Sequence, residues 1–152
     1  KSRLLRYLLV KPLGEGDRSR TTLALKGFFD VQKGITIPYI GLVLLNKDKT
    51  VFDVYSIEPG VDVEGMVGSS YADIDFEGGE DVLYKVLTFY RAHKDHPMGY
   101  RGTEIAFKLY KDDNFLGWLI FQVDMGVLKR KYNVDEKDLR KFHFEESEAN
   151  AG

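Results

Sequence analysis

Two histidines, His93 and His96, are the residues of this chain whose types and spacing come closest to a metal site, with Asp95 between them. Imidazole nitrogens and carboxylate oxygens are common ligands of transition metals. The pair falls where a helix is expected to end, so the two rings need not share a face. A histidine near a helix C-terminus also has a structural use through the helix dipole. A metal-assisted enzyme that uses His93 and His96 is therefore a weak alternative, and no cofactor is expected.

Basic and aromatic residues lie close together at several points of the sequence. Aromatic faces beside cations are what single-stranded nucleic acid binding requires. The formal net charge is −2, from 22 basic and 24 acidic residues, and this balance supplies no general attraction to nucleic acid. Single-stranded nucleic acid binding is therefore an alternative function. The residues that would serve it are Arg3, Arg6, Tyr7, Arg18, Arg20, Lys129, Arg130, Lys131 and Tyr132.

Two runs contain no polar side chain, IGLVLL at residues 40–45 and LGWLIF at residues 116–121. An antiparallel strand with one face in water alternates apolar and polar residues, so these runs predict a sheet that is covered on both faces. The cover is either a second layer of the same chain or another molecule. In an extended strand Leu116, Trp118 and Ile120 point to one side, and a large aromatic residue is a favourable interface anchor.

The favoured function is therefore a non-catalytic binding or assembly module that acts through an apolar, aromatic sheet face. Leu116, Trp118 and Ile120 are the predicted partner-binding residues. The expected partner is another protein or a second copy of the chain, which makes a homo-oligomer the expected assembly. No Ser–His–Asp or paired-carboxylate arrangement can be recognised from spacing alone, so no catalytic residue is predicted.

The elements that would position these residues centre on residues 80–94, EDVLYKVLTFYRAHK. The apolar residues recur at helical spacing, and acidic residues open the segment while basic residues close it, as the helix dipole favours. This pattern predicts one principal helix. The apolar residues of its stripe are Val82, Leu83, Val86, Leu87 and Tyr90.

Most other segments have the patterns of strands and turns. Residues 21–32 alternate and predict a strand, and residues 35–57 and 103–124 predict two hairpins, each with a Lys-Asp pair in its turn. Residues 3–10 are compatible with a strand or a helix, and the proline at position 12 favours a buried strand. Residues 127–144 predict one or two short helices.

Together these elements predict a single α+β domain over residues 1–144, with a mainly antiparallel sheet of about six strands curled around the principal helix. A small C-terminal helical cap and an acidic tail, residues 145–152, complete it. The length of 152 residues suits one domain, and the absence of cysteine excludes disulfides and thiol catalysis. No apolar run approaches the ~20 residues of a membrane helix, and the N-terminus lacks the pattern of a signal peptide, so a cytoplasmic location without a membrane partner is expected.

Overall fold

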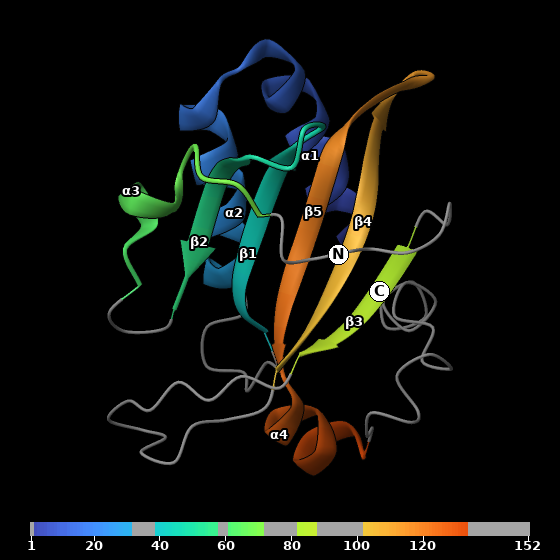
Figure 1. The fold of residues 1–152 in the computed structure, drawn as a ribbon. Coiled ribbons are helices and arrows are strands. Elements are labelled where there is room, and N and C mark those ends of the chain that lie inside the picture. Colours follow the sequence, from blue (N-terminus) through green and yellow to red (C-terminus); the bar gives the residue numbers. More distant parts are fainter. Residues whose placement is uncertain (1, 32–38, 58–60, 72–81, 88–101, 134–152) are drawn as a thin grey trace.

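A computed structural model shows an antiparallel sheet with two helices packed on one of its faces (Figure 1). The fold class predicted from the sequence, α+β with an antiparallel sheet, is confirmed. The structure describes residues 2–31, 39–57, 61–71, 82–87 and 102–133. The acidic tail at residues 145–152 lies outside them.

Five strands form the described sheet, in the order β2-β1-β5-β4-β3, and every pair of neighbours is antiparallel. The two runs without polar side chains lie in β1 and β5, the second and third strands of this order. Both strands therefore have a neighbour on each side and cover on each face, which explains why they do not alternate. The strands span Tyr39–Asn46 (β1), Val51–Ser56 (β2), Val82–Leu87 (β3), Gly102–Lys111 (β4) and Asn114–Asp124 (β5).

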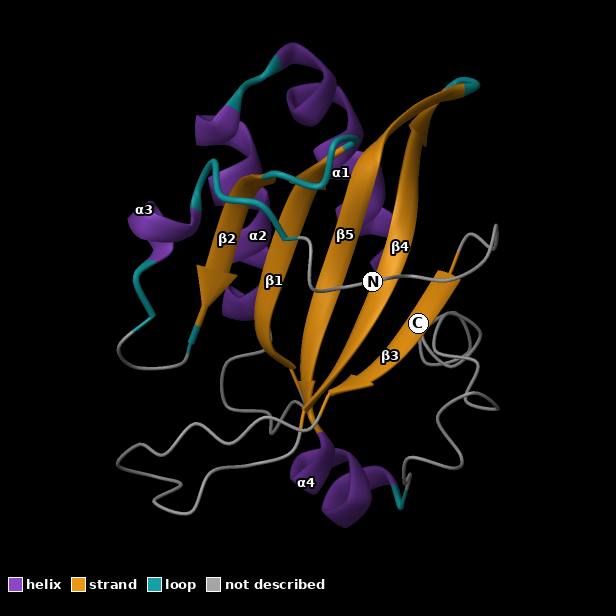
Figure 2. Ribbon diagram, in the orientation of Figure 1, coloured by secondary structure: helices purple, strands orange, loops and turns teal. Residues whose placement is uncertain are grey.

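The helices on the sheet are α1, Ser2–Glu15, and α2, Arg18–Asp30, which lie behind the strands in Figure 2. Every fourth residue of α1 from Leu5 to Leu13 is buried against the sheet, and α2 buries Leu25, Phe28 and Phe29 there. We call the face that they cover the helix face. Gly16, at φ 70°, ends α1 in the left-handed conformation that glycine tolerates best.

Two sequence-based predictions fail in this layer, because residues 3–10 and 21–32 were expected to form strands. The alternation in the second segment would bury Leu23 together with Leu25, yet Leu23 is exposed, and the buried residues instead follow helical spacing. The side chain of Asp17 accepts a hydrogen bond from the backbone N–H of Arg20 over 3.3 Å, which caps the start of α2. Burying one stripe of a capped helix on the sheet therefore stabilises this segment more than the strand that its alternation predicted.

The predicted principal helix is also wrong, because Val82–Leu87 forms the edge strand β3. Its six residues, VLYKVL, contain a single charged side chain, and over so short a length such a pattern does not separate a buried strand from a helix. Backbone pairing with β4, from Val82 opposite Phe107 to Leu87 opposite Gly102, decides the outcome. The rest of residues 80–94 lies outside the described residues, and the described sheet has five strands rather than about six.

The second face of the sheet, opposite α1 and α2, has its own cluster of buried side chains. The short helix α3, Val63–Met66, lies beyond β2 in Figure 1, and its residues Val63 and Met66 pack against this cluster together with Tyr71. Residues of the chain that follow β2 therefore supply part of the cover that the sequence predicted. The buried members of the cluster are Val43, Leu45, Val51, Val54, Ala106 and Ile120.

Beyond β5 the chain turns into the short helix α4, Met125–Val127, and a single π-helical turn, Leu128–Tyr132. Asp124 Oδ1 accepts hydrogen bonds from the backbone N–H groups of Gly126, over 2.8 Å, and Val127, over 3.3 Å. This part of the predicted C-terminal cap is helical, and its remainder, residues 134–144, lies outside the described residues. None of the described helices is long and apolar enough to cross a membrane.

Candidate functional site

The register of the strands sets the side chains of the second face in three rows that cross β2, β1, β5 and β4. The first row is polar, the next is entirely apolar, and the third combines apolar residues with a lysine. The three rows are Ser56, Gly41, Gln122 and Glu104; Val54, Val43, Ile120 and Ala106; and Val51, Leu45, Trp118 and Lys108. The register therefore places a polar row directly beside a buried apolar row on the same face.

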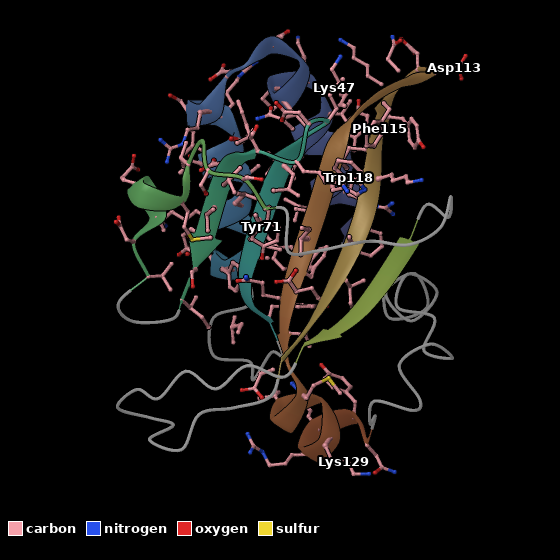
Figure 3. All side chains as sticks on the ribbon, in the orientation of Figure 1. Lys47, Tyr71, Asp113, Phe115, Trp118 and Lys129 are labelled. Carbon is pink, nitrogen blue, oxygen red and sulfur yellow. The ribbon has the colours of Figure 1, made fainter. Side chains whose placement is uncertain are left out.

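Hydrogen bonds join the polar row to Tyr71, which approaches the second face from the segment after α3 (Figure 3). The Tyr71 hydroxyl donates to Glu104 Oε1 over 2.7 Å, and Gln122 Nε2 donates to the Tyr71 oxygen over 3.3 Å. We call Tyr71, Glu104 and Gln122 the polar triad. Three separate parts of the chain therefore bring a phenol, a carboxylate and an amide together.

Glycine at position 41 leaves room for the polar triad. A Cβ atom placed on Gly41 would lie 2.5 Å from Gln122 Oε1 and 3.2 Å from the backbone oxygen of Tyr55. Both separations are shorter than van der Waals contact, so any larger residue would displace the Gln122 side chain. The small residue on β1 thus preserves the position of an amide that can both donate and accept hydrogen bonds.

Glu104 is one of three acidic residues that are buried in the described part of the chain, together with Asp53 and Asp124. Only 3% of Glu104 is exposed, on a face whose neighbouring row is apolar. Removing a carboxylate from water is costly unless hydrogen bonds compensate for the lost hydration, and Tyr71 supplies one of them. When it is ionised, a carboxylate accepts hydrogen bonds and cannot donate them, so this site favours a group that donates.

Trp118 lies on the same face, two rows from Glu104, where Figure 3 shows it beside Phe115. The ring centroids of Trp118 and Phe115 are 4.7 Å apart in an edge-to-face arrangement, and Lys49 Nζ is 5.9 Å from the Trp118 ring. The indole Nε1 atom is buried and has no hydrogen-bond acceptor among the residues that the structure describes. A buried indole N–H usually has a hydrogen-bond partner.

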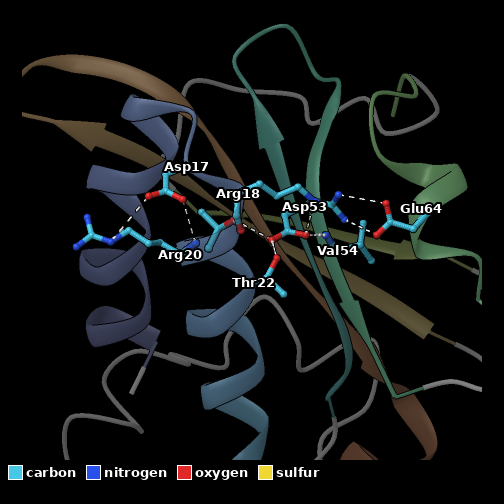
Figure 4. A network of polar contacts seen from close by, with 8 residues as sticks. Asp17, Arg18, Arg20, Thr22, Asp53, Val54 and Glu64 are labelled. Carbon is cyan, nitrogen blue, oxygen red and sulfur yellow. Dashed lines mark hydrogen bonds and ion pairs between the residues drawn. The ribbon is translucent and has the colours of Figure 1, made fainter.

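A second polar network connects the two layers at the edge of the sheet (Figure 4). Asp53 of β2, which is 1% exposed, accepts hydrogen bonds from Arg18 Nε over 3.3 Å and from the hydroxyls of Thr21 and Thr22 over 2.8 and 2.7 Å. The remaining nitrogens of the Arg18 guanidinium donate to both carboxylate oxygens of Glu64, over 3.2 and 2.9 Å. Arg18 therefore ties the start of α2 to α3.

The same contacts shift the pKa values of Arg18 and Glu64. Hydrogen bonding to Glu64, supported by Asp53, raises the pKa of Arg18 above its ordinary value. Hydrogen bonding to Arg18 lowers the pKa of the Glu64 carboxyl. Because α3 also packs Val63 and Met66 against the second face, this ion pair helps to hold part of the cover over the candidate site.

The predicted partner-binding residues do not share one face. Trp118 and Ile120 belong to the second face, but Leu116 packs against the helix-face core. Gly117 lies between them at φ 153°, where the register of β4 and β5 also shifts. This irregularity breaks the alternation, so the prediction that Leu116 and Trp118 point the same way is wrong.

The residues assigned to nucleic acid binding do not form one surface. Arg6, Tyr7 and Arg20 line a common groove, whereas Arg18 is committed to Asp53 and Glu64. Lys129, Arg130, Lys131 and Tyr132 follow the end of β5, while the groove adjoins the β4–β5 turn at the other end of that strand. The side chain of Arg3 is outside the described part. Eleven strand residues separate the two ends by roughly 35 Å.

The weak metal site at His93 and His96 lies outside the described residues. Within the part of the chain that the structure describes, no group of three or more His, Cys, Asp or Glu side chains is arranged to hold a metal ion.

The sequence analysis did not identify the polar triad. Glu104 occupies an outward position of an alternating strand, and such a position is normally solvated. Gln122 comes directly after the apolar run of β5. That run indicated that both faces of the strand are covered, so it was the one local signal that the polar residue beside it would also be covered. Tyr71 had no signal, since its position over the sheet depends on the path of the chain after α3.

Comparison with known proteins identifies the fold. No protein-family model matches the sequence, and no curated protein matches it. A domain of a sensory box/GGDEF family protein from Vibrio parahaemolyticus matches with a TM-score of 0.51 at 15% identity, over 81% of this chain and 50% of that one. The sensor domain of the V. cholerae histidine kinase DctB matches with a TM-score of 0.54 at 14% identity, over 80% and 45%.

A third match is the extracellular domain of a histidine kinase, with a TM-score of 0.53 at 15% identity, over 85% of this chain and 50% of that one. The chain therefore spans about half the length of each of these structures. At such identities the likeness concerns the fold alone: the chain has the fold of part of these sensor and extracellular domains.

Proposed function

We propose that this chain is a non-catalytic ligand-binding module of the sensor type, and that a small molecule binds on the second face of its sheet. The observation that carries the proposal is Glu104, a buried carboxylate on a largely apolar face that accepts a hydrogen bond from Tyr71, which in turn accepts one from Gln122. The likeness of the fold to a histidine kinase sensor domain supports the same reading. Ligand sites combine a few polar groups with apolar walls in this way.

The chemistry of the polar triad favours a ligand that presents hydrogen-bond donors. An ionised Glu104 accepts hydrogen bonds, and an amino group provides several donors to one acceptor. Gln122 can both donate and accept, so it suits a second polar group on the same molecule. The row of Val43, Ile120 and Ala106 lies next to the triad and suits a short apolar portion. A small amine or amino acid combines these features.

A small molecule suits this face better than the protein partner or second copy expected from the sequence. Val63, Met66 and Tyr71 already pack against the face, and Trp118 is partly buried among these residues. A large flat partner needs an open surface, whereas a small ligand needs only a gap beneath the cover. The apolar, aromatic face therefore remains the proposed site, and the expected occupant changes from a protein to a small molecule.

The proposal also changes the expected location of the chain. A cytoplasmic location was inferred from sequence patterns, and one of the matched structures is an extracellular domain. We propose that the module faces the outside of the cytoplasm, where a sensor of small molecules meets its ligand. Fractionation of cells that express the full natural protein, with protease added to intact cells, tests this placement.

Titration with L-amino acids and with putrescine, followed by the fluorescence of the single tryptophan, tests the binding site. Trp118 lies on the proposed face, so a bound molecule changes its emission. Each amine is compared with the acid of the same skeleton that lacks the amino group, such as propionate for alanine. We expect saturable binding of at least one amine and none of its matched acid.

The variant Glu104→Gln retains the shape of the side chain and removes its charge. Its affinity for that amine should fall roughly tenfold or more, the loss expected when a charged hydrogen bond is removed. Glu15→Gln, the same change at an exposed residue of α1, is the matched control and should bind like the wild type. A folded Glu104→Gln protein with undiminished affinity would contradict the proposed site.

A further inference from the structure

An open groove lies along α1 on the helix side of the sheet, away from the polar triad. Its volume is about 1020 Å³, and its walls come from residues within 6–12 of α1, 20–24 of α2 and 108–112 at the end of β4. This volume is at the upper end of the range of small-molecule sites. The groove has no role in the function proposed above, because no member of the polar triad lines it.

Apolar side chains are unusually exposed in this groove. Tyr7 and Leu23 are 79% and 71% exposed, and Leu8 also lies open along its walls. These three residues are among the eight large apolar side chains that are exposed in the described part of the chain. Exposed apolar residues that gather at one place, rather than being scattered singly, mark an interaction site.

The charge of the groove is opposite to that of the whole chain. Its lining contains one acidic residue, Asp112, although the complete sequence has a net charge of −2. One of its cations, Arg6, lies over the ring of Phe107 at 4.6 Å from the centroid, which holds a positive charge at the wall. The five cationic residues of the lining are Arg6, Lys11, Arg20, Lys108 and Lys111.

This charge pattern selects among the classes of occupant. A symmetric contact between two copies would place the same cations against each other, which disfavours self-association here. A single strand of nucleic acid requires aromatic faces for its bases, but most apolar residues of the groove are aliphatic or proline, such as Leu8, Pro12 and Leu23. An occupant with an aliphatic body and a negative group matches both the walls and the cations.

We propose that this groove binds an amphipathic organic anion, a long-chain carboxylate whose hydrocarbon chain lies along Leu8 and Leu23 and whose headgroup is held by the lysines. The exposed side chains supply the apolar contact, and burying them with an alkyl chain stabilises the complex through the hydrophobic effect. Lys11 and Lys111 supply the charge complementarity. The site is separate from Glu104 and does not depend on the sensor-type function.

Isothermal titration calorimetry with dodecanoate, kept below its micelle concentration, tests this proposal. We expect saturable binding that weakens as salt is added, because salt screens the headgroup contacts. Dodecyltrimethylammonium has the same tail with a cationic head, and acetate has the same head without the tail. Both should fail to bind at the same concentrations.

Charge reversal identifies the groove as the place of binding. The double variant Lys11→Glu, Lys111→Glu should lower the affinity for dodecanoate roughly tenfold or more, since both changes oppose the anion. Lys47→Glu, Lys129→Glu makes the same total change of charge outside the groove and should leave the affinity unchanged. Leu23→Ser removes an exposed apolar contact without disturbing the core and should also weaken binding.

Three results would overturn the proposal. One is the absence of dodecanoate binding to the folded wild type. Another is equal loss of affinity in the groove and control variants, which would mean that the anion responds only to net charge. The third is displacement of dodecanoate by a short single-stranded oligonucleotide of comparable or higher affinity, which would assign the groove to nucleic acid instead.

Discussion

Arg18 and Asp53 connect the helix layer to the edge of the sheet, through a hydrogen bond of 3.3 Å from Arg18 Nε to Asp53 Oδ1. The two residues are 35 positions apart in the sequence. Asp53 also accepts from Thr21, Thr22 and its neighbour's backbone N–H, at Val54, so that one carboxylate organises the contact between α2 and β2. The stability of this contact can be tested directly.

Replacing Asp53 with alanine should lower the free energy of unfolding by about 2–4 kcal/mol, because several donors lose a charged acceptor in a buried place. Urea denaturation monitored by circular dichroism measures the loss. Asp113→Ala, at the exposed tip of the β4–β5 turn, is the matched control and should change stability by less than about 0.5 kcal/mol. Equal losses in the two variants would mean that the Asp53 network adds nothing.

The ion pair between Arg18 and Glu64 should stabilise the protein only above the acidic range. Arg18 lowers the pKa of Glu64 in the folded state, so the contribution is present at neutral pH and disappears as the pH falls through that lowered value. The Tm of Glu64→Gln should therefore lie below that of the wild type at pH 7, and the difference should close below about pH 4. A Tm difference that persists or grows below that pH would show that the ion pair does not lower the pKa of Glu64.

Substituting Gly117 with alanine should destabilise the protein by about 3 kcal/mol or more, from backbone strain and a steric clash together. Gly117 has φ 153°, and an added Cβ would collide with the backbone oxygen of Leu45 on β1. Gly27→Ala is the control, because it lies in α2 with nothing within 4 Å of the added atom. That change should stabilise by about 0.5–1 kcal/mol, the difference in helix propensity.

Truncation of two leucines of α1 should lower the stability by very different amounts. Leu9 is fully buried against the sheet, so Leu9→Ala should cost about 2–5 kcal/mol of unfolding free energy. Leu4 is 62% exposed on the same helix, and Leu4→Ala should cost less than about 0.5 kcal/mol. Chemical denaturation of the two variants side by side measures the difference. Similar losses would mean that α1 does not pack on the sheet through the face that carries Leu9.

The sequence by itself determined the antiparallel hairpins and the double cover of the central strands. The β1–β2 and β4–β5 pairs were predicted, because alternation and turn residues act over a few neighbouring positions. The two apolar runs, residues 40–45 and 116–121, correctly indicated strands that are buried on both faces. These features are local, so a single sequence contains them.

Only the tertiary structure decided between helix and strand for residues 2–15, 18–30 and 82–87, because each pattern fits both and packing outweighs small local preferences. It also decided which polar groups meet. Tyr71 and Gln122, hydrogen-bonded to each other, are 51 positions apart, and Glu104 joins them through the register of β4 on β5. Strand pairing and the path of the chain after α3 bring these three residues together, and no local pattern in the sequence encodes that meeting.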